Sequence, residues 1–316
     1  MTVSAASAKR AKLTEQLVNY FSFIGLVVVA LVFEIWTGGK LFGPRNIINI
    51  FNNFFTIGLA AMAYTFIMAL GELDLSVGAT VGISAAMAAF AGKVDTALIF
   101  PAALLTGLLV GSLNGVCIAK LNTASFIGTL AVSFIMRGIT TWTLNGTIGV
   151  SVSMRIYDQN WVKITLFCVL LVCLYILYEH CAYGKNCRAV GASKAAAEQS
   201  GIRVSRTRFI AFSLVGLICG LVGFFTLIHA FTASSNTGSA FEFDVLLAVL
   251  FGGMPLSGGW PVKFRAAVIG AVTMAILKSG MSLIGLDGMT QAIVKGLILI
   301  AVVSISFDRK NAGVIK

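Results

Sequence analysis

Charged residues are scarce in this chain: they make up 11% of its 316 residues, whereas soluble domains carry about 25%. A surface so poor in charge is not compatible with full exposure to water. With 58% hydrophobic residues and a mean hydropathy of +0.94, the composition indicates an integral membrane protein. Only two histidines occur, which argues against a histidine-rich metal centre.

Several motifs of enzymes and energy-converting proteins are also missing. The chain has no G-x-x-x-x-G-K-[ST] loop to hold ATP, no HExxH zinc motif and no GxSxG nucleophile motif. Its six cysteines form no CxxC pair and lie within or beside apolar runs, as is typical of reduced thiols. We therefore expect no enzymatic activity, no metal site and no cofactor bound by this chain.

Long apolar runs predict an all-α polytopic membrane protein with about ten transmembrane helices. Runs of about twenty residues favour helices over the shorter alternating strands of a membrane barrel. The third run is short for a full crossing, and Gly and Pro break the eighth. No soluble domain is attached, so residues 1–316 are predicted to form one transmembrane domain. The runs lie near residues 20–37, 46–70, 76–92, 98–119, 124–145, 162–181, 208–232, 243–259, 264–285 and 289–307.

The net charge of +11 is unevenly distributed between the two sides that ten crossings define. With the N-terminus in the cytoplasm, the cytoplasmic segments hold three times as many Lys and Arg as the outer segments, as the positive-inside rule requires. Both termini are then cytoplasmic, and residues 183–209 form the largest cytoplasmic loop. Because no soluble basic domain is present, we expect no binding of nucleic acid.

The basic segment 183–209 contains a short predicted helix. Ser193 is placed to cap Lys194–Ser200, and Gly201 to end it in a left-handed turn. A helix of two turns is marginal alone in water, so it needs a surface to dock on. The alternative is a solvated loop whose cations only enforce orientation.

Two further segments carry acids next to helix starts. Glu72 and Asp74 are expected at the surface or facing a polar cavity, because burying carboxylates is costly, and Ser76 is expected to cap the next helix. Glu242 and Asp244 begin a helix that glycines and prolines then interrupt, either to line a transport pathway or to turn between spans.

Small and polar residues within the spans allow packing and pathway roles. Gly107, Gly111 and Gly115 share one helix face and predict close helix packing. Other polar residues near the spans either face a pathway or bond to a neighbouring helix. These residues are Asn52, Asn53, Asn114, Arg137 and His229.

Five segments in order resemble the permease subunit of a bacterial ribose-type ABC importer. They are "GELDLSVG" (71–78), "ASFIGTLAVSFIMRG" (124–138), "YGKNCRAVGASKAAAEQSGI" (183–202), "FGGMPLSGGWP" (251–261) and "QAIVKGLILIAVV" (291–303). The chain departs from the family pattern at Glu72, where glycine is usual, at Ser193, where asparagine is usual, and at Trp260-Pro261.

The resemblance implies a multi-pass protein of the bacterial cytoplasmic (inner) membrane that imports a pentose-like or hexose-like sugar by alternating access. It implies three partners: a cytoplasmic ABC ATPase that binds ATP and Mg, a second permease chain in a homodimer or heterodimer, and a periplasmic or lipid-anchored binding protein. Membrane lipid surrounds the complex. Residues 191–202 become the segment that couples the chain to the ATPase.

The resemblance indicates coupling residues and motif residues, and the polar or aromatic residues near the spans supply candidates for the pathway. The coupling residues are Gly191, Ser193, Lys194, Ala197, Glu198 and Gly201. The motif residues are Asp74, Ser76, Gly252, Gly253 and Gly258. The candidate pathway residues are Asn52, Asn53, Asn114, Phe126 and His229.

Other functions remain open at this point. An ion-coupled secondary transporter would need an ion site in the membrane, for which Glu34, Glu72, Asp74 and Lys295 are the candidates. A membrane anchor would not need interrupted helices. An ABC permease for a nucleoside or a signalling furanose would have the same motifs.

Overall fold

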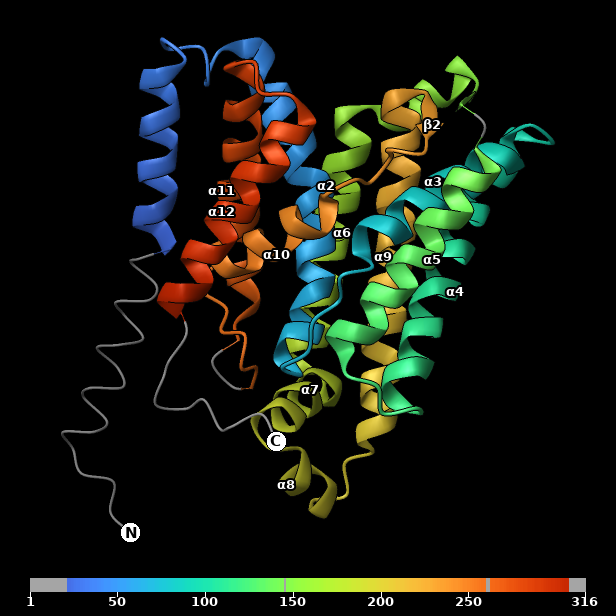
Figure 1. The fold of residues 1–316 in the computed structure, drawn as a ribbon, viewed down its shortest axis with the longest axis vertical. Coiled ribbons are helices and arrows are strands. Elements are labelled where there is room, and N and C mark those ends of the chain that lie inside the picture. The colour runs from blue at the N-terminus through green and yellow to red at the C-terminus, as the bar shows by residue number, and fades with distance from the viewer. Residues whose placement is uncertain (1–21, 145, 260–261, 307–316) are drawn as a thin grey trace.

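The computed structural model describes residues 22–144, 146–259 and 262–306, and these fold into a bundle of helices (Figure 1). After a first helix, Ser22–Trp36, come α2 (Pro44–Ala69), α3 (Val77–Gly92), η1 (Thr96–Leu98), α4 (Ile99–Ala119), α5 (Ser125–Thr143), η2 (Val152–Asp158), α6 (Asn160–Tyr175), η3 (Ile176–His180), α7 (Ala182–Ala192), α8 (Lys194–Gln199), α9 (Val204–Ala230), α10 (Phe241–Phe251), α11 (Phe264–Leu283) and α12 (Gly288–Ser306). Strands β1 (Thr147–Gly149) and β2 (Thr232–Ser234) pair antiparallel, with Ile148 opposite Ala233.

Each of the ten predicted apolar runs coincides with a helix, which confirms a mostly helical, polytopic membrane protein. Five helices in the described ranges are long and apolar enough to cross a bilayer by length and composition: α2, η1 with α4, α6 with η3, α9 and α11. The number of crossings stays a prediction. The predicted cytoplasmic termini lie outside the described residues, but the first helix begins, and α12 ends, toward the end of the bundle that carries α7 and α8 (Figure 1).

The helix α2 forms the centre of the bundle. Nearly every residue from Phe55 to Ala69 is buried, because this stretch is apolar all round and has neighbours on every side. It contacts α6, α9, α10 and α11 along its length, and α7 near its C-terminal end. One helix therefore connects the two ends of the bundle.

The predicted glycine face of α4 is confirmed as a close contact with α9. A Cβ atom on Gly107 would lie 2.3 Å from the carbonyl oxygen of Gly216, and one on Gly111 would lie 2.5 Å from that of Phe212. Backbones approach this closely only where side chains are absent, which is how small residues let helices associate in lipid.

Two short helices, α3 and α10, begin in the middle of the bundle rather than at its ends (Figure 1). Non-helical segments lead to them: the extended residues 71–76 from one end and the turn residues 235–240 from the other. The two starts meet there, since a Cβ atom on Gly238 would lie 2.2 Å from the carbonyl oxygen of Gly78. Broken helices of this kind are tolerated in a membrane where protein covers the backbone.

Candidate functional site

The short helix α8 has the boundaries that the sequence predicts, to within one residue. The Ser193 hydroxyl accepts the backbone N–H of Ala196 at 3.3 Å, and Gly201 follows the helix with a φ of +80°. Ala197 packs inward, whereas Lys194 and Glu198 are exposed. The helix lies at the end of the bundle and presents its remaining surface outward (Figure 1).

The prediction that residues 183–209 form a loop around this helix is wrong in part, because α7 is helical over Ala182–Ala192. Two of the six basic residues are also buried rather than solvated. Arg188 binds Glu179 at 2.8 Å and lies 4.8 Å from the ring centre of Tyr178. Arg208 binds Glu72 and donates to the carbonyl oxygen of Ile118 at 2.9 Å. These pairs fix α7 and the start of α9 to the membrane part of the chain.

Three glycine-bearing segments meet at the C-terminal end of α2, in a contact that we name the loop junction (Ala69, Gly71, Gly191, Gly258 and Gly259). A Cβ atom on Gly191 would lie 1.9 Å from the carbonyl oxygen of Ala69, and one on Gly258 would lie 2.4 Å from the nitrogen of Gly71. The N–H of Gly259 donates to the carbonyl oxygen of Ala69 at 2.9 Å. The early motif, the coupling segment and the late motif therefore touch one another.

The other motif glycines also occupy positions that a side chain would disturb. A Cβ atom on Gly252 would lie 2.0 Å from the carbonyl oxygen of Ala266, and Gly253 and Gly258 have φ values of +85° and +74°. The link between α10 and α11 is thus a turn that is held against α2 and α11. Trp260 and Pro261 of this motif lie outside the described residues.

One of the two acids of the early motif, Asp74, is not where the sequence predicts it, whereas Glu72 is partly exposed and binds Arg208. Asp74 is 3% exposed and faces neither the surface nor a cavity. The prediction that Ser76 caps α3 with its side chain is wrong as well, because its hydroxyl donates to Asp74 Oδ1 at 2.6 Å. Asn114 donates to the same hydroxyl at 2.6 Å. This buried network holds the extended segment before α3 against α4.

Hydroxyl groups of the 124–138 segment bind the same stretch of backbone. Ser125 Oγ accepts the N–H of Leu73 at 3.2 Å, and Thr129 Oγ1 accepts the N–H of Leu75 at 3.0 Å. Because the stretch is extended, its N–H groups have no helical partners, and these hydroxyls satisfy them. The motif residues Ser125 and Thr129 thus stabilise the early motif.

The starts of α3 and α10 meet at an ion pair. Arg137 of α5 donates to Glu242 Oε2 at 3.2 Å and to the carbonyl oxygen of Gly238 at 3.0 Å. A Cβ atom on Gly78 would lie 1.9 Å from Glu242 Oε2, so glycine is required there for the pair to form. A carboxylate beside the N-terminal turn of α3 is also favoured by the helix dipole.

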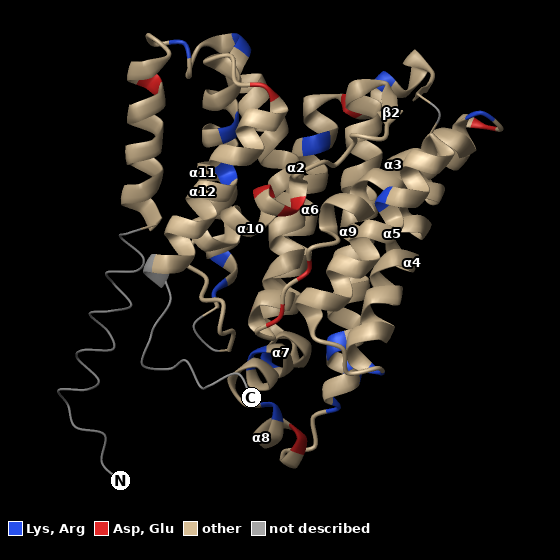
Figure 2. Cartoon of the chain, viewed as in Figure 1, with Lys and Arg blue, Asp and Glu red and all other residues tan. Residues whose placement is uncertain are grey.

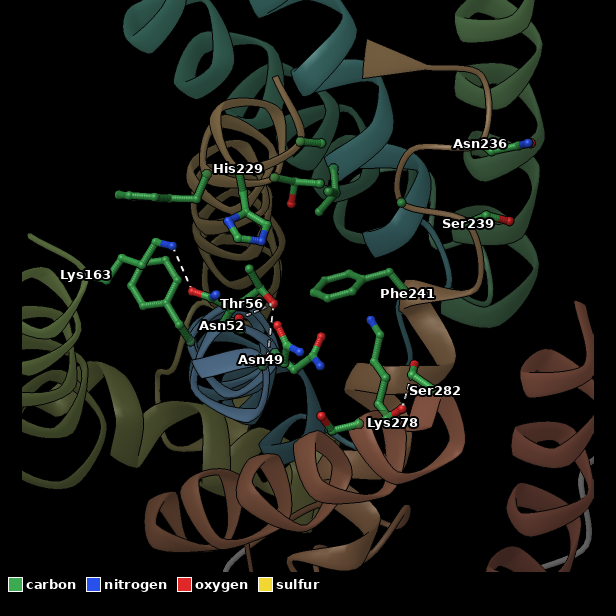
Figure 3. A pocket seen from close by; sticks show the side chains of 18 of the residues that line it. Asn49, Asn52, Thr56, Lys163, His229, Asn236, Ser239, Phe241, Lys278 and Ser282 are labelled. Atoms are coloured by element: carbon green, nitrogen blue, oxygen red, sulfur yellow. Dashed lines mark hydrogen bonds between the residues drawn. The ribbon is translucent and has the colours of Figure 1, made fainter. Parts of the chain in front are cut away.

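A polar cavity of about 550 Å³ opens in the half of the bundle opposite α7 and α8, and we name it the outer cavity (Figure 3). Its walls come from α2, α6, α9, α11 and the segment that leads to α10. Apolar side chains of Phe55, Val81, Phe225 and Phe241 contribute to it as well. Its polar lining residues include Asn46, Asn49, Asn52, Asn53, Thr56, Lys163, His229, Asn236, Ser239, Lys278 and Ser282.

An ion network closes one side of this cavity. Asp158 binds Lys163 at 2.6 Å and His229 at 3.0 Å, and Lys163 also donates to Asn52 Oδ1 at 2.8 Å. Burial alone would raise the pKa of Asp158, but the bonds from His229 and Lys163 outweigh it and lower the pKa below its ordinary value. Asp158 is therefore a carboxylate at neutral pH and holds α6 and α9 together beside α2.

A second ion network lies at the other wall. Asp244 is 1% exposed and binds two lysines, Lys278 of α11 at 2.9 Å and Lys295 of α12. The acid at the start of α10 is therefore bound to both of the helices that follow it. Figure 2 shows acidic and basic positions inside the bundle as well as toward its two ends.

The structure brings some of the predicted pathway residues together and separates others. Asn52, Asn53 and His229 line the outer cavity. Asn114 is buried against Ser76, and Phe126 is 51% exposed on α5, so neither lines this cavity.

The cavity wall also contains residues that are not among the predicted pathway residues: Asn46, Asn49, Lys163 and Lys278. A signal for part of this set was available in the sequence. Asn46, Asn49, Asn53 and Thr56 follow the spacing of one helix face within an otherwise apolar run. No comparable signal marks Lys163 or Lys278, which reach the cavity from α6 and α11.

The chain is similar to known transport proteins over nearly its whole length. A family model described as branched-chain amino acid transport system / permease component matches residues 46–303. The ribose import permease protein RbsC of Bacillus subtilis is 30% identical over 301 residues, which is 92% of each chain. The RbsC protein of Escherichia coli K12 is 28% identical and covers 96% of this chain and 98% of its own. The L-arabinose ABC transporter permease protein AraH of Azospirillum brasilense is 29% identical, covering 94% of this chain and 90% of its own. No solved structure shows a significant match.

Proposed function

The chain belongs to the family of branched-chain amino acid transport system permease components, and we propose that it is the membrane subunit through which an ABC importer moves a sugar into the cytoplasm. It is a multi-pass protein of the bacterial cytoplasmic membrane. A separate ATPase chain binds ATP and Mg and supplies the energy. Relatives named for ribose, arabinose and xylose transport support a sugar as the solute.

The observation that carries this proposal is the loop junction. Segments 71–78, 183–202 and 251–261 are far apart in the sequence, yet all three meet at the end of α2 beside α7 and α8. A force applied to α8 by an ATPase reaches α2 through Gly191 and reaches α10 and α11 through Gly258 and Gly259. We therefore propose that Gly191, Ser193, Lys194, Ala197, Glu198 and Gly201 belong to the coupling segment.

The outer cavity is the proposed entrance of the solute pathway. It lies at the end of the bundle away from the coupling segment, and amides and hydroxyls line it. Sugar hydroxyls need polar partners, since stripping them of water without replacement costs a few kcal/mol for each group. Asn52, Asn53 and His229 take part there. A second permease chain, identical or similar, completes the pathway, and a binding protein delivers the solute.

The proposed topology has ten crossings with cytoplasmic termini. It places α8 in the cytoplasm and η2 and the β1–β2 pair on the outer side. The excess of Lys and Arg on the cytoplasmic segments and the ten helices that coincide with the ten apolar runs support this arrangement.

The test is uptake of labelled solutes into vesicles that contain the chain with the ATPase and binding protein encoded beside it. We expect uptake that needs ATP and stops when the ATPase carries an inactivating substitution. Uptake that persists in vesicles without the ATPase would refute the proposal and favour a secondary transporter.

A further inference from the structure

The outer cavity is rich in basic groups and poor in acidic ones. Among the described residues that line it, Lys163, His229 and Lys278 carry basic side chains, and no carboxylate is present. A sugar without charge needs only hydroxyl and amide partners, so the basic groups call for an explanation. These basic groups differ in how far nearby acidic residues balance their positive charge.

The charge of Lys163 is balanced. Asp158 lies 2.6 Å from its amino group and also binds His229 at 3.0 Å. The side chain of Lys163 is only 4% exposed, and its amino group is further occupied by Asn52 Oδ1. The wall beside Lys163 therefore carries its own carboxylate, that of Asp158.

The charge of Lys278 is not fully balanced. Asp244 provides one carboxylate for two ammonium groups, those of Lys278 and Lys295. The neighbouring pair of Arg137 and Glu242 is neutral in sum and supplies no further acid. One positive charge therefore remains in this part of the described structure.

The excess charge faces the cavity. The side chain of Lys295 is 5% exposed and that of Asp244 is 2% exposed, whereas that of Lys278 is 28% exposed. In Figure 3 the side chain of Lys278 points into the cavity between Phe241 and Asn49. Lys278 is thus the group at which the surplus charge meets the solvent in the cavity.

Two free amides from α2 line the same cavity. No hydrogen bond from the described residues occupies the side chains of Asn49 and Asn53, both of which line the cavity. Asn46 is different, since it donates to the carbonyl oxygen of Leu41 and accepts from Ser279. The wall therefore offers one ammonium group and two free amides, which suits a ligand with one anionic group and several hydroxyls.

An uncompensated positive charge within the membrane is costly, and an anionic ligand relieves that cost. We propose that the solute is a sugar acid whose single carboxylate binds Lys278, while Asn49 and Asn53 bind its hydroxyls. One surplus charge matches a carboxylate, whereas a phosphate would bring a charge of nearly −2. This inference rests on the proposed import function and names the substrate class.

The experiment compares sugar acids with their neutral parent sugars, in cells that express the chain with its ATPase and binding protein. The labelled pairs are D-ribonate with D-ribose, D-gluconate with D-glucose, and D-galacturonate with D-galactose. For at least one pair, the wild-type chain should import the acid at least tenfold faster than the neutral sugar. Lys278→Met should lower uptake of that acid at least tenfold, and by a larger factor than it lowers uptake of the neutral partner.

Two control variants separate charge from folding. Lys278→Arg keeps the charge and should retain most uptake of the acid, and Lys120→Met removes an exposed lysine at the end of α4 and should behave as wild type. Lys278→Met leaves Asp244 paired with Lys295, so normal amounts of the variant are expected in the membrane.

A binding measurement that does not depend on transport completes the test. For the wild-type chain in nanodiscs, the preferred acid should raise the unfolding temperature more than its neutral partner does, and Lys278→Met should abolish that difference. The inference is overturned if neutral sugars are imported as well as or better than their acids, or if no acid in the panel stabilises the chain. ATP-dependent uptake of neutral sugars alone would leave the import function standing, whereas uptake independent of the ATPase would refute the function itself.

Discussion

Replacing Gly191 with alanine tests whether the loop junction transmits force from the ATPase to the membrane helices. The new Cβ atom would lie 1.9 Å from the carbonyl oxygen of Ala69 and 2.8 Å from the nitrogen of Gly259. Ordinary contacts of a Cβ atom begin near 3.4 Å, so α7 and α2 must separate by about 1.5 Å. That movement also pulls apart the hydrogen bond of 2.9 Å between Gly259 and Ala69.

The expected cost follows from two contributions. Overpacking a tight contact costs about 1–3 kcal/mol, and losing a hydrogen bond costs about 0.5–1.5 kcal/mol. Together they amount to about 1.5–4.5 kcal/mol, and every 1.4 kcal/mol is a factor of ten in an equilibrium. If the junction carries the coupling, we expect uptake to fall at least tenfold while the ATPase continues to hydrolyse ATP.

The assay measures uptake and ATP hydrolysis on the same vesicles, with the binding protein and solute added. Gly138→Ala is the matched control, because a Cβ atom on Gly138 in α5 would have no atom within 4 Å. We expect the control to couple hydrolysis to uptake as the wild type does. A Gly191→Ala chain with normal uptake and normal stimulation of the ATPase would refute the role of the junction.

Three further predictions concern stability and access. Arg208→Ala leaves the carboxylate of Glu72 buried without its partner and should destabilise the chain by about 3–5 kcal/mol, whereas the double change with Glu72→Gln should recover much of this in thermal unfolding. Cys187 should resist maleimide at pH 8, because burial raises the pKa of its thiol to about 12 and only about one thiol in ten thousand is then the reactive thiolate; labelling should increase as the pH rises. A Ser200→Cys thiol, exposed directly after α8, should react, and from the cytoplasmic side only. Gly111→Val should force α4 from α9 and lower the yield of folded protein, whereas Gly296→Ala, with open space around it, should not.

Much of the fold could be predicted because local patterns determine it. Apolar runs of sufficient length must be helical in lipid, so the helices were predictable before their contacts were known. The ends of α8 were predictable because Ser193 and Gly201 act on their own backbone. The face formed by Gly107 and Gly111 follows from helical spacing, which needs no knowledge of the partner helix.

The features that were missed depend on partners far away in the sequence. The helix α7 has two glycines and several polar residues, and it is stabilised by contacts such as that of Arg188 with Glu179 and Tyr178. Ser76 precedes a helix and so fits the pattern of a cap, but the buried carboxylate of Asp74 competes successfully for its hydroxyl. A local pattern cannot weigh such competing partners.

The outer cavity illustrates the same limit. Asn52, Asn53 and His229 could be selected as polar residues near spans, but nothing local distinguishes them from Asn114. Lys278 is a cation within an apolar run, and its pairing with Asp244 joins residues 34 positions apart. Which polar residues share a cavity is decided by how α2, α9 and α11 are arranged.

The unbroken course of α2 has a consequence for how motion crosses the membrane. At 1.5 Å per residue, its 26 residues extend about 39 Å, with Asn46, Asn49 and Asn53 near one end and Ala69 at the other. Because its interior has no proline and its residues 55–69 are almost all buried, we expect the helix to move as a stiff rod, so that a small tilt imposed at Ala69 swings the asparagines relative to α11. Rigid-body tilting of α2 can then open and close the solute entrance. A proline placed midway along α2 would let the two ends of the helix move independently.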